Sequence, residues 1–289
     1  MYKRQIEVPV DFSKSSLNAL EYAIEFANRS EADLRLIYVK KHKDYEPDFM
    51  LEKYVLEGVK NLNELFERLI EKYKDKFKGD FDYKIREGNI SEEVTNQAKY
   101  DDAFLIIMGT HGISGFQEMW IGSNAYRVVS TAPCPVLTVR PQFKFDGIKK
   151  IILPLDVTET TRQKVGITAY IASLFDAEVE VLGVRETDLP KVIETINKSI
   201  DWTCNVLEKK GIKYTKDFIK CDNITDCTIK YAQEHGGSLI SIMTEQPTNF
   251  WDVILGKYAQ QMVNHSPIPV LSVRPKSPLY SYNGIFSWI

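Results

Sequence analysis

The sequence has few cysteines and histidines, with four of each among 289 residues. No CxxC pair occurs, so neither a disulfide framework nor a zinc site is predicted for Cys134, Cys204, Cys221 and Cys227. No hydrophobic run approaches the length of a membrane span, and the apolar run after the charged N-terminus is too short for a signal peptide. We therefore expect a cytoplasmic protein with no membrane partner.

An excess of positive charge is also absent. The formal net charge is -3, and the lysines and arginines are scattered along the chain, so no nucleic-acid partner is predicted. Hydrophobic residues make up 44% of the chain and charged residues 27%, a balance typical of a water-soluble globular protein. At roughly 150 residues per domain, the chain has room for two domains.

The chain contains an internal repeat with an offset of 145 residues. Residues 6–13 (IEVPVDFS) match 151–158 (IILPLDVT), residues 32–39 match 177–184, and the repeat ends at 133–141 and 267–275 also match. The sequence therefore predicts domains at 1–141 and 149–275, a linker at 142–148 and an apolar C-terminal extension at 276–289.

Within each repeat, short β-branched runs alternate with longer amphipathic stretches, which predicts βαβ units built on a parallel sheet. Five strands are expected per domain, near 6–10, 33–39, 81–86, 103–108 and 134–139, and near 149–154, 177–184, 213–219, 238–243 and 268–273. Helices are expected in the first domain near 14–29, 50–77, 91–99 and 120–131. The fold class is therefore α/β, with two tandem open-sheet domains.

The start of the first helix is the best-defined boundary. Ser13 is a candidate N-cap, and one buried stripe is predicted from Leu17, Leu20, Ala23, Ile24 and Ala27. Pro9 and Pro154 are expected at strand ends, because a proline inside a central strand removes a hydrogen-bond donor. Asp11 then lies just beyond the first strand.

A glycine motif follows the predicted fourth strand. Gly109-Thr110-His111-Gly112 is separated by nine residues from Gly122-Ser123 at the start of a helix. Glycines let backbone amides approach an anion, and a helix N-terminus adds unpaired N–H groups, so this spacing suits a phosphate subsite. Strand-to-loop turns and helix caps also use glycine and serine for structural reasons, and that alternative stays open for each glycine.

Together, residues 8–11 (VPVD), the glycine motif and the terminal strand 133–137 (PCPVL) resemble the universal stress protein family. The resemblance is strong over 4–141 and rests on the repeat over 149–275. It implies a five-stranded parallel sheet of order 3-2-1-4-5 with helices on both faces. It also implies an ATP, ADP or AMP site at the carboxyl ends of strands one and four, where the topology switches direction.

The resemblance assigns roles to residues of the first domain. Asp11 would lie beside the adenosine and phosphates, with Mg as a candidate metal delivered by the nucleotide. Val39 would offer backbone groups to adenine, and Gly109 and Gly112 would shape the loop. The full set of expected nucleotide-binding residues is Pro9, Val10, Asp11, Phe12, Ser13, Val39, Met108, Gly109, Thr110, His111, Gly112, Gly122, Ser123 and Asn124. Ile113 stands where many members carry Arg or Lys, which favours AMP or ADP.

The motif has decayed in the second repeat, which has Met243-Thr244-Glu245-Gln246 and Gly256-Lys257 at the corresponding places. Side chains there would occupy space that phosphates need. The second domain is therefore predicted to be structural or regulatory. Lys257 is either an internal cation in the vacated phosphate subsite or a solvated helix residue.

The function predicted is that of a nucleotide-binding stress-response or signalling protein, with no catalytic residue assigned. The sequence identifies no nucleophile with an orienting carboxylate beside His111. One alternative is a slow ATPase or an autophosphorylating enzyme with Ser123 as acceptor, and another is a ligand-free scaffold. The two repeats are expected to form an intramolecular pseudo-dimer through their apolar fifth strands. A homodimer and a protein partner are left open.

Overall fold

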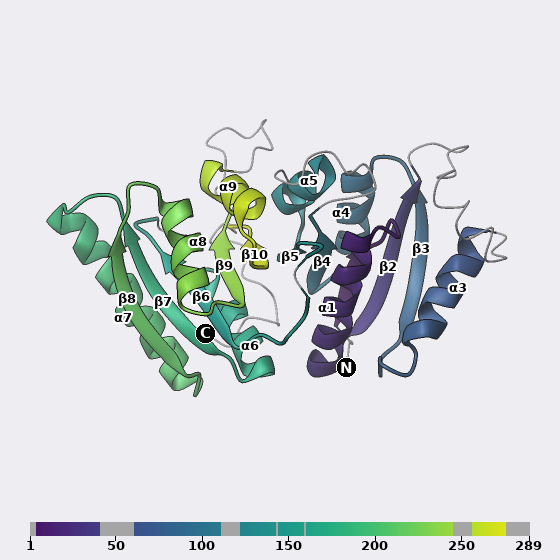
Figure 1. The fold of residues 1–289 in the computed structure, drawn as a ribbon, viewed down its shortest axis with the longest axis horizontal. Helices are drawn as coiled ribbons and strands as arrows, with labels where there is room; N and C mark the ends of the chain where they lie inside the picture. The colour runs from purple at the N-terminus through teal and green to yellow at the C-terminus, as the bar shows by residue number, and fades with distance from the viewer. Residues whose placement is uncertain are drawn as a thin grey trace. The chain divides into compact units, whose positions relative to one another are not determined.

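The protein was analysed as a computed structural model, which describes residues 4–40, 61–110, 122–142, 144–158, 160–244 and 256–275. The described chain divides into two compact units, the first ending at Gln142 and the second beginning at residue 144 (Figure 1). The expected extension 276–289 lies outside the described residues, as do His111 and Gly112.

Strands and helices alternate in both units. The first unit contains β1 (Gln5–Pro9), α1 (Lys14–Ser30), β2 (Asp33–Lys40), α3 (Leu62–Tyr73), β3 (Phe81–Glu87), α4 (Ile90–Tyr100), β4 (Leu105–Gly109), α5 (Ser123–Thr131) and β5 (Val136–Val139). The second contains β6 (Lys150–Leu155), α6 (Val165–Phe175), β7 (Glu178–Arg185), α7 (Pro190–Lys209), β8 (Tyr214–Lys220), α8 (Ile224–Glu234), β9 (Leu239–Met243), α9 (Lys257–His265) and β10 (Val270–Val273).

The sheet topology confirms the predicted fold class. In the first unit the strands follow the order β3-β2-β1-β4-β5, and in the second β8-β7-β6-β9-β10. Every described pairing within a unit is parallel. Each unit is thus an open α/β sheet of order 3-2-1-4-5.

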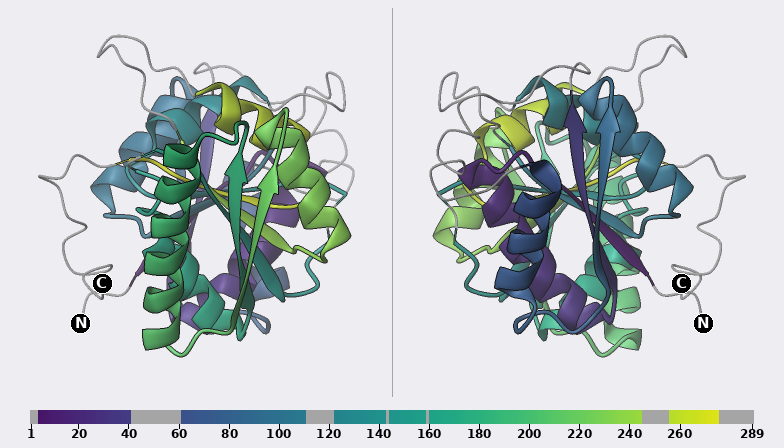
Figure 2. Two further views of the ribbon diagram at one scale, coloured as in Figure 1. Left: turned by 90° about the vertical axis from the view of Figure 1, so that its left-hand side faces the viewer. Right: turned by 90° about the vertical axis from the view of Figure 1, so that its right-hand side faces the viewer.

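Helices cover both faces of each sheet. In the first unit the Tyr73 hydroxyl at the end of α3 donates to Glu21 Oε1 of α1 at 3.3 Å, while α4 packs against α5. In the second unit α8 packs against α9. Figure 2 shows α7 and α8 on opposite sides of the β7–β8 pair in its left view, and α3 and α4 on opposite sides of β3 in its right view.

Helix α1 begins and packs as its sequence predicts. The Ser13 hydroxyl accepts a hydrogen bond from the Ser16 N–H at 3.2 Å, so Ser13 is the N-cap. Leu20 and Ile24 are buried, as are Ala23 and Ala27 of the predicted stripe, whereas Leu17 is only half-buried. Burial of Ala19, Tyr22 and Phe26 as well makes the apolar face wider than the predicted stripe.

The two prolines near the first strand of each unit differ in position. Pro9 closes β1 as expected, whereas Pro154 lies inside β6, opposite Leu182 of β7. The ladder between β6 and β9 has already ended at Ile152, so Pro154 removes no donor from that side. The expectation that Pro154 ends its strand is therefore wrong by one residue.

Among the described residues of the first unit, one buried side chain is a carboxylic acid. Glu7 of β1 is fully buried, and burial raises its pKa to about 9, an effect that the neighbouring Asp101 carboxyl reinforces and Arg35 and Arg86 oppose. Arg35 pairs with Asp101 at 2.5 Å and with Asp82 at 2.7 Å. The Glu7 carboxyl is therefore neutral at pH 7, while Asp101 carries the charge.

Candidate functional site

The candidate site begins where β1 and β4 part. The two strands pair only at Ile6 with Leu105 and at Glu7 with Ile106. Beyond these pairs β1 continues along β2, and β4 continues along β5. The carboxyl ends of strands at such a switch point are where open α/β sheets hold ligands. Pro9, Val10 and Asp11 on one strand end and Met108, Gly109 and Thr110 on the other are brought to this position.

Asp11 organises the turn between β1 and α1. Its Oδ1 accepts a hydrogen bond from the Ser13 N–H at 3.0 Å, and its own N–H donates to the Ser16 hydroxyl at 3.3 Å. These bonds satisfy backbone groups that precede the helix. Asp11 therefore has a structural role in the turn, besides the expected contact with a nucleotide, and it is half-buried at the strand end.

The same turn holds a strained residue that sequence analysis did not identify. Phe12 has φ +60°, in the left-handed region that costs a non-glycine residue about 1–2 kcal/mol. Its buried ring lies 4.8 Å from the ring of Phe66 and 6.0 Å from that of Tyr38, measured between centroids. Aromatic packing thus offsets the backbone strain. No local pattern in the sequence announced this conformation.

Gly109 has a structural reason to be glycine. A Cβ at this position would lie 2.8 Å from both the carbonyl carbon and the carbonyl oxygen of Ser15. Ser15 belongs to the first turn of α1, so the absent side chain lets the helix start directly against the end of β4. Contact with α1 explains this glycine without reference to a phosphate.

Gly122 differs from Gly109 in its contacts with the described residues. Its N–H donates to the Thr110 carbonyl oxygen at 2.8 Å, which ties the start of α5 to the end of β4. Among the described residues, a Cβ at Gly122 would meet that oxygen alone, at 3.4 Å. Gly122 caps α5 without a side-chain hydrogen bond, and Ser123 and Asn124 form its first turn. The α5 N-terminus therefore faces the switch point with backbone N–H groups.

Val39 is another residue of the expected nucleotide site. It is half-buried near the carboxyl end of β2, adjacent to β1. Within the described ranges there is no group of three or more His, Cys, Asp or Glu residues placed to hold a metal ion. None of the helices described is long and apolar enough to span a bilayer.

Comparison with known proteins identifies the family. The sequence profile described as the universal stress protein family matches residues 1–140 of this chain. A universal stress protein of Bacillus subtilis is 30% identical over 144 residues, which are 46% of this chain and 96% of that protein. One of Methanocaldococcus jannaschii is 31% identical over 145 residues, 48% of this chain and 83% of that protein. The chain belongs to the universal stress protein family.

The likeness in fold extends over both repeats. The crystal structure of a universal stress protein from Archaeoglobus fulgidus covers 95% of this chain and 99% of its own, with a TM-score of 0.74 and 16% identity. At that identity the likeness shows the fold alone. It accords with two units of one fold in the chain.

The second unit keeps the aspartate turn. Asp156 Oδ1 accepts a hydrogen bond from the Thr158 N–H at 2.9 Å, and the Asp156 N–H donates to the Thr161 hydroxyl at 3.3 Å. The offset of 145 makes these the counterparts of the bonds around Asp11. The turn has thus survived where the glycine motif has not.

The helix that follows this turn begins late. The offset of 145 places the counterpart of Lys14 at 159, but α6 begins at Val165, six residues later. Hydrogen bonds from the Thr161 N–H to the Thr158 oxygen and from the Gln163 N–H to the Thr160 oxygen form tight turns instead. Met243 stands at the counterpart of Gly109, where a Cβ would collide with an α-helical first turn. A side chain at position 243 would clash with a helix that began as early as α1 does. The loss of the glycine and the late start of α6 therefore have the same steric explanation.

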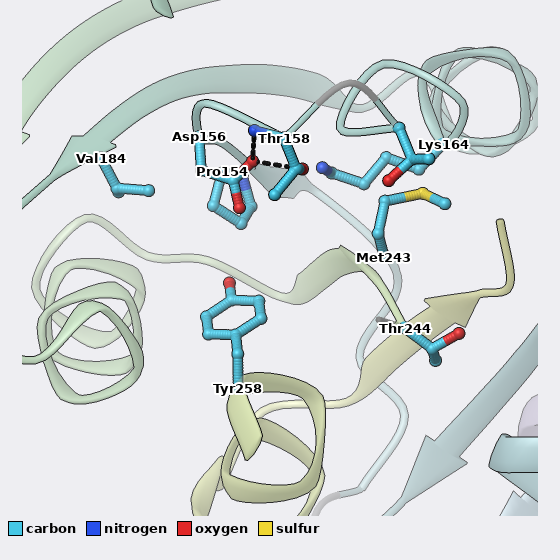
Figure 3. Close-up of a pocket in the computed structure, with 9 residues that line it drawn as sticks. Pro154, Asp156, Thr158, Lys164, Val184, Met243, Thr244 and Tyr258 are labelled. Atoms are coloured by element: carbon cyan, nitrogen blue, oxygen red, sulfur yellow. Dashed lines mark hydrogen bonds between the residues drawn. The ribbon is translucent and has the colours of Figure 1, made fainter. Parts of the chain in front are cut away.

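A small pocket remains at the strand ends of the second unit (Figure 3). Most of its lining residues are repeat counterparts of the expected nucleotide-binding residues, namely Pro154, Asp156, Thr158, Val184, Met243, Thr244 and Tyr258. Lys164 also lines it and is only 2% exposed. Lys257 is exposed at the start of α9, so the interpretation of Lys257 as the internal cation is wrong. Lys164 corresponds to the buried Ala19, and that mismatch in the repeat was the available signal.

Proposed function

We propose that the first unit binds an adenine nucleotide, ATP, ADP or AMP, at the carboxyl ends of β1 and β4. The observation that carries this proposal is the bond from Gly122 to Thr110, since it holds the N-terminus of α5 beside the switch point. A helix N-terminus favours negative charge through its N–H groups and its dipole. Asp11 lies at the end of the neighbouring strand, as membership of the universal stress protein family leads one to expect.

The chain would then act as a nucleotide-binding stress-response or signalling protein in the cytoplasm. The second unit would be structural or regulatory, because Met243 and Lys164 occupy the counterpart of the nucleotide site. Binding would be asymmetric, with one nucleotide per chain.

Calorimetric titration of ATP, ADP and AMP into the full chain tests the proposal. A stoichiometry of one is expected. Gly122→Ala should weaken binding by about tenfold or more, because its methyl group approaches the α5 N–H groups that would hold phosphate. Among the described residues, the nearest atom to this methyl group is the Thr110 oxygen at 3.4 Å, an ordinary van der Waals distance.

Gly256→Ala is the matched control. Gly256 caps α9 with φ -55° and ψ 149°, close to the -58° and 143° of Gly122, and neither cap uses a side-chain bond. Both substitutions therefore carry the same capping penalty. Equal affinity loss in the two variants, or a stoichiometry of two, would contradict the proposed site.

Asp11→Asn and Asp156→Asn form a second matched pair. The two carboxylates make equivalent turn bonds, of 3.0 Å to the Ser13 N–H and 2.9 Å to the Thr158 N–H. Only Asp11→Asn should weaken nucleotide binding. Titrations with and without Mg²⁺ test whether a metal contributes at Asp11.

A further inference from the structure

The pocket of the second unit differs in chemistry from a nucleotide site. Its volume is about 30 Å³, room for one or two water-sized groups. Figure 3 shows the Lys164 amine extended toward Thr158 and Asp156, with the Tyr258 hydroxyl pointing toward the same space from α9. An amine, a carboxylate and hydroxyl groups thus converge on a small, largely enclosed volume.

The amine of Lys164 is held in a defined orientation. It donates to the Thr161 carbonyl oxygen at 2.8 Å and to the Thr161 hydroxyl at 3.2 Å. A neutral amine has two N–H groups and one lone pair. With both N–H groups directed at Thr161, the lone pair is left for another atom.

Burial also favours the neutral form of this amine. Burial lowers the pKa of Lys164 to about 8, although the Asp156 carboxylate acts in the opposite direction. At pH 7 about a tenth of Lys164 is therefore unprotonated, whereas an exposed lysine is almost fully protonated. An unprotonated lysine amine is a nucleophile.

We propose that Lys164 is a nucleophile that forms an imine with a small carbonyl compound, an aldehyde or ketone of few heavy atoms, bound in this pocket. The site lies in the second unit and is independent of the nucleotide site proposed for the first. The pocket volume sets the size of the compound.

The charges around the amine favour a carbonyl compound over an anionic ligand. Asp156 is the charged neighbour that acts on Lys164, and its carboxylate would repel a phosphate or carboxylate group. Acylation of the amine would abolish its positive charge and leave Asp156 without that counter-ion. An iminium ion keeps the positive charge beside Asp156, so imine formation conserves the pair.

The reaction balances without an oxidant or reductant. The nitrogen lone pair attacks the carbonyl carbon, a C–N bond forms, and the carbonyl oxygen takes up a proton as the nitrogen loses one. The hydroxyl group then leaves as water with a second proton while the C=N bond forms. Thr158 and Tyr258 line the pocket and supply hydroxyl groups able to relay these protons.

Reductive trapping of the full-length protein tests the proposal. The protein is treated with acetaldehyde and cyanoborohydride at pH 7, and the modified lysines are mapped by mass spectrometry of peptides. We expect Lys164 to be alkylated about tenfold or more faster than the exposed Lys257, because the pocket increases the unprotonated fraction of the Lys164 amine. Alkylation of Lys164 at a rate equal to or below that of Lys257 would overturn the proposal.

Two controls separate the pocket from the local sequence. In concentrated guanidinium chloride the rate advantage of Lys164 should disappear, since it depends on the folded site. In the folded protein the Lys164 rate should level off above about pH 8, whereas in the unfolded chain it should continue to rise. An advantage that persists in the unfolded chain, or identical pH profiles, would also count against an amine activated by the pocket.

Discussion

Glu7 shows how one buried side chain links the sheet to solution pH. Its carboxyl is fully buried in the first unit. The neighbouring Asp101 carboxylate, which pairs with Arg35, makes a second negative charge at Glu7 unfavourable. Hydrogen bonds from Gln97 and Arg35 outweigh burial and hold the pKa of Asp101 below its ordinary value. Folding therefore takes up a proton at Glu7 at neutral pH.

Replacement of this residue predicts a change in pH dependence. The pKa of Glu7 rises from 4.5 to about 9 on folding, so between these values the folded state binds one proton more than the unfolded state. As the pH rises through this range, the free energy of unfolding of the wild type should therefore fall by up to about 1.4 kcal/mol per pH unit relative to that of Glu7→Gln. Urea unfolding across this range measures the difference. Parallel pH profiles for the two proteins would show that Glu7 ionises normally.

At the residue scale, some features of the structure could be predicted from the sequence and others could not. Ser13 as N-cap was predictable, because a hydroxyl residue precedes an amphipathic run. The left-handed Phe12 was not, since its φ of +60° depends on packing against Phe66, which lies far away in sequence. Lys164 was overlooked for a related reason. Its burial follows from a displaced helix start rather than from its neighbours in the chain.

At the scale of elements, the contact between a strand end and a helix start distinguishes the two units. α1 begins against Gly109, whereas α6 begins six residues late beside Met243. The strands were predictable to within a few residues from β-branched runs. The late start of α6 was harder to predict, because the repeat matches on both sides of it and the mismatch of Lys164 with Ala19 does not by itself show that the helix begins six residues later.

The contact at Gly109 predicts a cost for the smallest side chain. Gly109→Ala should destabilise the first unit by about 1–3 kcal/mol, because backbone atoms of Ser15 stand 2.8 Å from the added Cβ and cannot rotate away. Gly122→Ala, whose methyl group would lie 3.4 Å from the nearest described atom, should cost less than about 1 kcal/mol. Denaturant unfolding of both variants provides the measurement. Equal losses of stability in the two variants would mean that α1 shifts easily to accept the added methyl group.

At the scale of the whole molecule, the chain carries two units of one topology with different strand-end chemistry. Sequence analysis recovered this organisation because the first-strand and last-strand motifs occur twice. The expected pseudo-dimer through the fifth strands stays a prediction, as does the cytoplasmic location. Glycine positions alone could not separate a ligand contact from a packing contact, and Gly109 and Gly122 proved to have different surroundings.

Nucleotide binding by one unit predicts asymmetric protection from hydrogen exchange. At about 100 times the dissociation constant, bound ligand stabilises the state that binds it by about 2.7 kcal/mol. Amides in the Asp11 turn and at the start of α5 should then exchange more slowly with nucleotide present. Amides around Asp156 and at the start of α9 should not change. Mass-spectrometric exchange measures both regions in one sample, and equal protection would contradict a single site.

The coupling between Met243 and the turn at 160–164 bears on how a duplicated gene diverges. Restoring glycine at 243 alone would leave Lys164 in its loop, and replacing Lys164 alone would leave the methionine where a helical turn must pack. Neither single reversion rebuilds the site found in the first repeat. Reversal of the second copy to the arrangement of the first would therefore need both changes together.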